Sequence, residues 1–378
     1  MSIATPKLHV VVCGCGVIGL TSAIRLLQAG YGVTVIAKDL PGDPLHATYA
    51  SSAAGAHHLS FADDDDLRQQ TWDKRTFDVM MAEENTEGDA STILKLRQVE
   101  YYATEGQTHI KFFEQLPDFR VHDKDELPPF AVHAVSFTSL TMDTGPYLAK
   151  LVNRLEGLGG IVRRATLTSL ADALFICPEA SAVINCTALG SASLTDVKDA
   201  GVYPLRGQVV VLNAPWCRAE GRTLQVGALS ADGGEGGERT YIIPRKSGQV
   251  IIGGTREEND WYASAHAELA EPRPETTEDI KRRALILYPE LVPEKGRISG
   301  RSPVPSDLDD IVARVVVGFR PARTGGTRLE RGEDIMSGQK KIPVVHNYGH
   351  SGAGWQSCWG CAEDVVAIVE QSIRPAIA

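Results

Sequence analysis

The sequence has 378 residues, which exceeds the usual size of one domain and predicts two domains that share an interface. With 43% hydrophobic and 23% charged residues and no biased tract, it has the composition of a globular protein. The net charge of −10 argues against a nucleic-acid-binding protein, because such a protein needs a basic face.

No apolar run reaches the ~18 residues that span a bilayer, and Val10–Val12 is too short for a secretory signal. We therefore expect an intracellular protein. The seven cysteines agree, because an odd number at these spacings is no disulfide framework. Cys358 and Cys361 form a lone CxxC, which predicts apolar packing in a helix rather than a zinc site, and we expect no metal.

The N-terminal residues have the pattern of a βαβ unit. Val10–Cys13 predicts a buried parallel strand, because it is a short β-branched run followed by glycines. Apolar residues at helical spacing from Val17 to Leu27 predict a helix that Gly30 ends. Val33–Ala37 then predicts the second strand.

Gly14-x-Gly16-x-x-Gly19 stands between the first strand and the helix, and in that place it predicts a bound dinucleotide. Gly14 allows the tight turn, Gly16 lets the backbone approach a pyrophosphate, and Gly19 lets helix and strand pack closely. The pyrophosphate would lie at the helix N-terminus. An acidic residue usually closes the second strand to hold the ribose; here Lys38 precedes Asp39, which either takes that role one position late or is a solvated turn charge.

The middle of the chain predicts further α/β elements. Residues 63–102 are predicted to be helical, with Asp63–Asp66 as a solvated helix N-terminus rather than a metal site. Gly145–Leu158 predicts another helix. Ala182–Cys186 predicts a strand that leads into a turn at Thr187–Gly190 and so returns the chain to the cofactor.

From Val202 to Thr255 the pattern changes to strands, which predicts a second, antiparallel domain. The predicted strands are Val209–Leu212, Thr240–Ile243 and Val250–Ile252, and a flexible tract at Gly233–Gly237 separates the first two. Beyond them we expect a helix at Glu278–Leu287, a strand at Ile311–Val317 and a closing helix at Ala362–Ile373.

Six segments carry a more specific pattern: VVVCGCGVIGL (10–20), PLRGQ (204–208), YIIP (241–244), GGT (253–255), GFRPAR (318–323) and VVHNYGHSGAGWQSCWGCA (344–362). They occur in order along nearly the whole chain. Together they resemble the flavin-dependent D-amino-acid oxidase family, and more closely its D-aspartate oxidase branch.

The resemblance implies an α/β fold of two domains, in which a Rossmann-like FAD-binding domain is interleaved with a substrate domain built on a large, mostly antiparallel β-sheet. It places the FAD domain at 1–56, 145–200 and 304–378 and the substrate domain at 57–144 and 201–303. The FAD should be bound non-covalently. The expected FAD contacts are Gly14, Gly16, Val17, Ile18, Gly19, Lys38, Asp39, Ser51, Ser52, Ala54, Gly55, Thr187, Gly352, Ala353, Gly354, Trp355 and Gln356.

The resemblance also implies which residues bind the substrate. Arg320 would bind the α-carboxylate, because a guanidinium matches a carboxylate bidentately; the alternative is a structural salt bridge. Tyr241 would donate its hydroxyl to the same carboxylate, unless it is only a packing residue. Ser351, Gly352 and Gln356 would surround the substrate amine and the flavin.

Arg256 coincides with an arginine that D-aspartate oxidases use for the second carboxylate of the substrate, a group that cannot be desolvated without a partner. It would select aspartate over alanine. The alternative is an arginine paired with Glu257, Glu258 or Asp260.

A second arginine of animal relatives falls here in the Gly233–Gly237 tract, so another group must complete the acidic pocket. Arg239, Arg245, His57 and His58 are the candidates. The two histidines lie where the family chain passes the flavin, although a lone histidine is more often a satisfied structural residue.

The implied activity is a D-aspartate oxidase that converts acidic D-amino acids and O₂ to the 2-oxo acid, ammonia and H₂O₂ by hydride transfer to flavin N5. The alternatives are an oxidase of neutral D-amino acids, a glycine- or sarcosine-type oxidase and a redox-silent FAD-binding protein. No nucleic-acid or membrane partner is expected, and a homo-oligomer is left open. The family is commonly peroxisomal, yet Pro375–Ala378 is no Ser-Lys-Leu-like signal, which leaves the cytoplasm as the other expected location.

Overall fold

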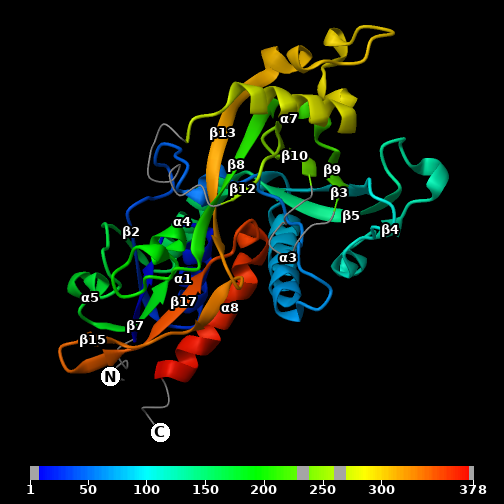
Figure 1. The fold of residues 1–378 in the computed structure, drawn as a ribbon. Helices are drawn as coiled ribbons and strands as arrows, with labels where there is room; N and C mark the ends of the chain where they lie inside the picture. Colours follow the sequence, from blue (N-terminus) through cyan, green and yellow to red (C-terminus); the bar gives the residue numbers. More distant parts are fainter. Residues whose placement is uncertain (1–7, 228–237, 259–269, 374–378) are drawn as a thin grey trace.

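The computed structural model describes residues 8–227, 238–258 and 270–373. They contain two large sheets, which occupy the lower and upper parts of the molecule in Figure 1. No helix among these residues is both long and apolar enough to cross a membrane.

The lower sheet has six strands and a nucleotide-binding topology. Its order is β14 (Arg328–Arg331), β17 (Val344–Tyr348), β7 (Ala180–Asn185), β1 (His9–Cys13), β2 (Gly32–Ala37) and β6 (Ile161–Arg164). All neighbours run parallel except β14 and β17, which are antiparallel. The chain therefore returns beside β1 at β7, about 170 residues later, and beside β7 at β17, about 160 residues later again, which agrees with the predicted α/β class.

Helices cover both faces of this sheet, which explains why β1 is apolar at every buried position. Val10 and Val12 pack with α1 (Val17–Gln28), α4 (Thr144–Gly157) and α8 (Gly354–Ile373). Val11 and Cys13 pack on the other face with α5 (Asp172–Ile176). A strand buried on both faces needs a continuous apolar run, and that run is the signal in the sequence.

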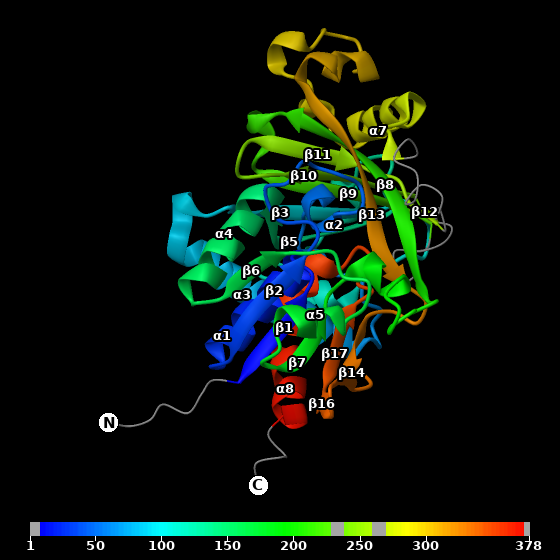
Figure 2. The ribbon, with the colours of Figure 1, turned by 90° about the vertical axis from the view of Figure 1, so that its left-hand side faces the viewer.

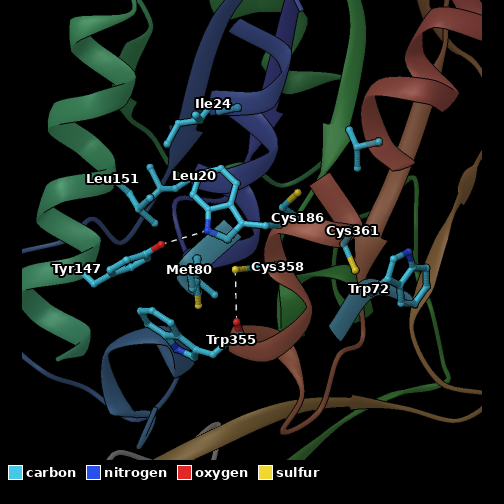
Figure 3. Close-up of a cluster of buried hydrophobic side chains, with 14 of the residues drawn as sticks. Leu20, Ile24, Trp72, Met80, Tyr147, Leu151, Cys186, Trp355, Cys358 and Cys361 are labelled. Atoms are coloured by element: carbon cyan, nitrogen blue, oxygen red, sulfur yellow. Dashed lines mark hydrogen bonds between the residues drawn. The ribbon is translucent and has the colours of Figure 1, made fainter. Parts of the chain in front are cut away.

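Figure 3 shows the larger of these cores, where Leu20 and Ile24 of α1 meet Leu151 of α4 and Cys358 of α8. Cys358 and Cys361 are both fully buried in α8, as predicted for apolar packing. Tyr147 accepts a hydrogen bond from the indole nitrogen of Trp359 at 3.1 Å.

The upper sheet has nine strands and is mostly antiparallel. Its path is β12 (Glu257–Glu258), β8 (Val202–Asn213), β11 (Gln249–Gly253), β10 (Glu238–Pro244), β9 (Glu220–Val226), β3 (Ile93–Tyr102), β5 (His133–Met142) and β4 (Arg120–Val121), and β13 (Val312–Arg323) pairs with β8. The exception is the β3–β9 pair, which is parallel. A small separate hairpin joins β15 (Ile335–Ser337) to β16 (Lys340–Ile342).

The two faces of the upper sheet differ in what covers them. Val210 and Ile242 point to α7 (Pro274–Leu287), which lies on the side of the sheet away from the six-stranded sheet (Figures 1 and 2). Val209 and Ile243 point the other way and pack with Ala53 of the short helix α2 (Ala50–Ala53). Because side chains alternate along a strand, the inner face of this sheet is directed at the nucleotide-binding half.

Two predicted elements were wrong in extent. The helix predicted over 63–102 is α3 (Leu67–Glu87) followed by β3, because Gly88 ends the helix and Ile93–Tyr102 pairs with β5 over its whole length. The closing helix begins at Gly354 instead of Ala362. Its Gly360 packs so closely on α3 that an added Cβ would lie 2.4 Å from the Trp72 carbonyl oxygen, which explains a glycine inside a helix.

The predicted tract Gly233–Gly237 lies outside the described residues. The strand β13 falls in the segment 304–378 predicted for the FAD domain, but it pairs with β8 from Val312 to Arg323 and so belongs to the nine-stranded sheet. The division of the chain into two interleaved domains at the predicted boundaries stays a prediction.

Candidate active site

A cavity of about 1480 Å³ lies between the carboxyl ends of the parallel strands and the inner face of the upper sheet. Gly14 after β1, Lys38 after β2 and Thr187 after β7 line it from below, and Tyr241 of β10 and Arg320 of β13 line it from above. Small-molecule sites usually measure roughly 300–1,000 Å³, so this space suits a dinucleotide together with a substrate. Its place agrees with the rule that open α/β sheets bind ligands at the carboxyl ends of their strands.

The glycine-rich loop needs each of its three glycines. Gly14 has a φ of +113°, and a Cβ there would lie 2.3 Å from the Cys186 carbonyl oxygen. A Cβ on Gly19 would lie 2.0 Å from the Gly14 carbonyl oxygen, and one on Gly16 would lie 2.7 Å from Ser51 Oγ. The Val17 backbone N–H donates to that same Ser51 hydroxyl at 3.0 Å, so the start of α1 faces the cavity with a hydroxyl beside it.

The opposite wall of the cavity is the start of α8. His350 lines the cavity just before this helix, and its Nε2 has no hydrogen-bond partner among the described residues. Burial lowers the pKa of His350 to about 3, so its ring is neutral at pH 7. The tight glycine loop, which a Cβ at any of its three glycines would fill, fits a bound FAD.

Arg320 and Tyr241 converge on one short backbone segment. The Arg320 guanidinium lies across Gly207, where an added Cβ would be 2.4 Å from Nη1, and Nη1 donates to the Thr255 carbonyl oxygen at 3.2 Å. The Tyr241 hydroxyl lies over Gly254, where an added Cβ would be 2.2 Å from it. Because Gly254 and Thr255 are neighbours, the structure brings together two donors that are 79 residues apart in sequence.

Two further arginines line the same cavity, and each faces an acidic residue. Arg256 Nη2 lies 3.3 Å from Glu258 Oε1. Arg239 Nη2 lies 2.8 Å from Oε2 of the buried Glu100, and its guanidinium carbon is 5.0 Å from the centre of the Phe61 ring. Arg256 therefore pairs with an acidic residue, as the alternative from the sequence predicted. It nevertheless lines the cavity.

Arg245 and His58, which were candidates to complete the pocket, do not line the cavity. Buried Arg245 donates to the carbonyl oxygens of Gly55 and Ala54 at 2.6 and 2.7 Å, so it holds the small-residue loop. His58 Nε2 is 2.8 Å from the Asp73 carbonyl oxygen. Both side chains therefore bond to backbone carbonyl oxygens behind the cavity wall instead of facing a ligand.

His57 does line the cavity, but it is no cation. Burial, and then the nearby Arg239, lower the pKa of His57 to about 3. Its Nε2 is 3.1 Å from the Ser139 hydroxyl. His57 can therefore offer a hydrogen bond to a ligand at neutral pH, while the positive charge in this cavity comes from arginines.

Most of the predicted contact residues reach the cavity, and two do not. Gly19 packs against Gly14, and the Ser52 carbonyl oxygen accepts a hydrogen bond from Thr144. Asp39 lines the cavity with its Oδ1 3.2 Å from His46 Nε2. The other predicted residues that line it are Gly14, Gly16, Val17, Ile18, Lys38, Ser51, Ala54, Gly55, Thr187, Ser351, Gly352, Ala353, Gly354, Trp355 and Gln356.

Sequence reasoning missed His350, although it stands inside the HNYGHSGAGW motif, because a motif does not tell which of its side chains lacks a partner.

Among the described residues, one group of metal-ligand types comes together, His9, Cys177 and Glu179, with ligand atoms within 4.8 Å of one another. It lies at the amino ends of β1 and β7, at the other end of the strands from the cavity.

A glycine-rich loop of the dinucleotide-binding type at one end of a cavity and an arginine–tyrosine pair at the other define a dinucleotide-binding protein with a place for an anionic ligand. A family model described as FAD dependent oxidoreductase matches residues 9–368, and the chain belongs to this family. The predicted cofactor, FAD, is thereby confirmed.

Curated relatives confirm the predicted resemblance. A D-aspartate oxidase of Cryptococcus neoformans var. grubii is 44% identical over 397 aligned residues, which cover 97% of each chain. A D-amino-acid oxidase of Schizosaccharomyces pombe is 34% identical, also over 97% of each chain. The solved structure of a glycine oxidase from Geobacillus kaustophilus covers 97% of this chain and 95% of its own with a TM-score of 0.67 and 16% identity, a likeness that supports the fold alone.

Proposed function

We propose that the protein is a D-aspartate oxidase, which oxidises acidic D-amino acids with O₂ to the 2-oxo acid, ammonia and H₂O₂. The observation that carries the proposal is the convergence of Arg320 and Tyr241 at Gly254–Thr255, directly before Arg256, in one cavity. A substrate with two carboxylates needs two separate cationic contacts. Arg320, which donates to the Thr255 carbonyl oxygen, and Arg256, which follows Thr255 in the chain, supply them. The 44% identity to a D-aspartate oxidase supports the same choice.

Arg320 and Tyr241 hold the α-carboxylate in this proposal. Tyr241 adds a hydroxyl donor, and Arg320 contributes a planar guanidinium whose geometry matches a carboxylate. Two donors fix both the position and the rotation of the carboxylate, so the α-carbon is held at one place in the cavity. Bound FAD supplies the acceptor for the two electrons that leave this carbon, and positioning is the main contribution of the protein.

Arg256 binds the second carboxylate, and Arg239 completes its pocket. Both arginines already face carboxylates of the protein, Glu258 and Glu100, so their charges are compensated when no substrate is bound. An entering carboxylate competes with Glu258 and Glu100 for the guanidinium N–H donors, and this exchange compensates its desolvation. His57 adds a neutral hydrogen-bonding group, since its pKa is about 3.

The remaining cavity residues hold the cofactor. The start of α1, with Gly14, Gly16 and the Ser51 hydroxyl, receives the pyrophosphate, because helix N-termini bind anions. Asp39 binds the ribose at the end of β2. His350 lines the cavity just before α8 and packs against the cofactor there.

A peroxide assay with D-Asp, D-Glu, D-Ala and L-Asp tests the proposal, with Arg256→Ala as the variant. Loss of a charged partner costs about 2–5 kcal/mol, which lowers kcat/KM for D-Asp roughly 30- to 4,000-fold and leaves D-Ala turnover unchanged. Arg273→Ala is the matched control, because Arg273 also pairs with a neighbouring acid, Glu257, but does not line the cavity. Faster turnover of D-Ala than of D-Asp by the unaltered enzyme would refute the proposed substrate.

The second arginine needs its own test, since removing Arg239 alone would leave the buried Glu100 without its partner. The double variant Arg239→Gln/Glu100→Gln removes both charges and should raise KM for D-Asp with KM for D-Ala unaffected.

The peroxisomal location implied by the family resemblance also stays a prediction, which colocalisation of the tagged full chain with a peroxisomal marker would test.

A further inference from the structure

One buried carboxyl group lies directly behind the cavity wall and is not used by the function proposed above. Asp73 of α3 is fully buried and does not line the cavity. Its Oδ1 accepts from Gln69 Nε2 at 2.7 Å, its Oδ2 accepts from Gln356 Nε2 at 3.4 Å, and the Ser60 hydroxyl also bonds to it. Gln69 and Gln356 both line the cavity, so Asp73 stands one layer behind two of its wall residues.

The part of the cavity in front of Asp73 receives the flavin ring if FAD binds as proposed. The pyrophosphate end is marked by the glycine loop at Gly14. The substrate end is marked by Arg320, whose Cδ would be 3.7 Å from a Cβ on Gly352. Gln356, in the first turn of α8, is four residues beyond Gly352, so it lies toward the substrate end of the cavity, where the ring would lie in the proposed placement.

We propose that Asp73 is a positioning residue of the flavin site: it orients the Gln356 amide, and its charge lowers the electron affinity of the bound flavin. This inference rests on the proposed FAD placement but not on the identity of the substrate. An ionised carboxylate only accepts hydrogen bonds, so Gln356 must turn its nitrogen toward Asp73 and its carbonyl oxygen away from it. The flavin-facing side of this amide is therefore an acceptor.

Charge explains the second part of the inference. Reduction adds negative charge to the ring, and the positive end of the α8 dipole favours it. A buried carboxylate nearby opposes that effect, because interactions between charges are weakly screened in the interior. Ionised Asp73 therefore disfavours the reduced flavin, whereas neutral Asp73 does not.

The surroundings of Asp73 allow its charge to change near neutral pH. Burial raises the pKa of Asp73 to about 7, although the hydrogen bonds from Ser60, Gln69 and Gln356 act in the opposite direction. Among the described residues, the titratable groups that face it are Asp66 at the N-cap of its own helix, His58 on the preceding loop and Cys361 on α8. Burial lowers the pKa of His58 to about 4 and raises that of the Cys361 thiol, so both are neutral at pH 7.

The test is a reductive titration of the FAD-loaded protein against a redox dye, without amino acid, at pH 5.5 and pH 8.5. Asp73→Asn keeps the shape of the side chain and removes its charge. At a fixed ratio of reduced to oxidised dye, the unaltered protein and Asp73→Asn should show the same reduced fraction of flavin at pH 5.5. At pH 8.5 the reduced-to-oxidised ratio should be about tenfold lower in the unaltered protein. Asp78→Asn is the control, because Asp78 is on the same helix but exposed and paired with Lys74.

Equal ratios for Asp73→Asn and the unaltered protein at pH 8.5 would overturn the proposal. If Asp73→Asn does not bind FAD, Asp73→Ser gives the second measurement: it also removes the charge, so the difference from the unaltered protein should again appear at pH 8.5 and vanish at pH 5.5. Because no amino acid is present, the result is independent of whether D-Asp is the substrate. A protein that binds FAD but gives no peroxide would fail the proposed function and still answer this question.

Discussion

Replacing Gly207 by alanine should displace the carboxylate-binding arginine and leave the fold intact. A Cβ at this position would lie 2.4 Å from Nη1 of Arg320 and 2.8 Å from its Cζ. Ordinary contacts between heavy atoms begin near 3.5 Å, so the guanidinium must retreat by about 1 Å. The tip of a long side chain can do this at little cost, and alanine is no worse than glycine in a strand. We therefore expect the free energy of unfolding to change by less than about 1 kcal/mol.

The function should suffer much more than the stability. A misplacement of about 1 Å in a positioning group can lower kcat/KM by roughly 100-fold. Steady-state peroxide assays with D-Asp measure this, and flavin absorbance shows whether FAD content is retained. Gly145→Ala is the control, because Gly145 in α4 has no atom within 4 Å of an added Cβ. A Gly207→Ala enzyme with kcat/KM within threefold of the unaltered one would refute the placement of Arg320 as the substrate anchor.

Three further changes have defined outcomes. Gly14→Ala combines a φ of +113° with a contact of 2.3 Å to the Cys186 carbonyl oxygen, so it should cost at least about 1–3 kcal/mol and abolish FAD binding, read by urea unfolding and flavin content. Arg245→Ala leaves two part-buried carbonyl oxygens without their donor and should cost about 1–3 kcal/mol; a melting temperature like that of the unaltered protein would contradict this role. Folding lowers the pKa values of His57 and His350 from 6.5 to about 3, so the folded protein binds fewer protons below pH 6.5 and loses about 1.4 kcal/mol per pH unit for each ring as the pH falls from 6.5 toward 3. Urea unfolding at pH 7 and pH 5 should show a loss about 2 kcal/mol smaller in His350→Asn, and equal losses in both proteins would argue that this histidine is not buried and neutral.

Features that depend on neighbouring residues were predictable. The Val10–Cys13 strand, the glycine loop and the helix to Gln28 follow from local sequence, because each is set by spacing within about twenty residues. The 63–102 prediction failed at β3 for the opposite reason. Residues 93–102 are held as a strand by pairing with β5 and β9, partners about 40 and 125 residues away, and such pairing overrides local preference.

The site was predictable only as a set of separate residues. The family motifs named Arg320, Tyr241 and Arg256 without showing that all three face one cavity. The same reasoning treated Arg245 as a candidate for the acidic pocket, whereas its guanidinium donates to two backbone carbonyl oxygens outside that pocket. No pattern in the sequence pointed to Asp73, because its partner Gln356 comes from a segment 283 residues away.

The sequence by itself determined the family, the cofactor and the α/β class, since these depend on residue types at short spacings along the chain. The tertiary structure decided which side chains share a wall of the cavity and which of them carry charge there. His57 is the clearest case: its place beside the flavin site could be expected from sequence, but its neutrality comes from burial and from Arg239, which lies 182 residues away. Charge and hydrogen bonding depend on distance in space, which only the folded chain fixes.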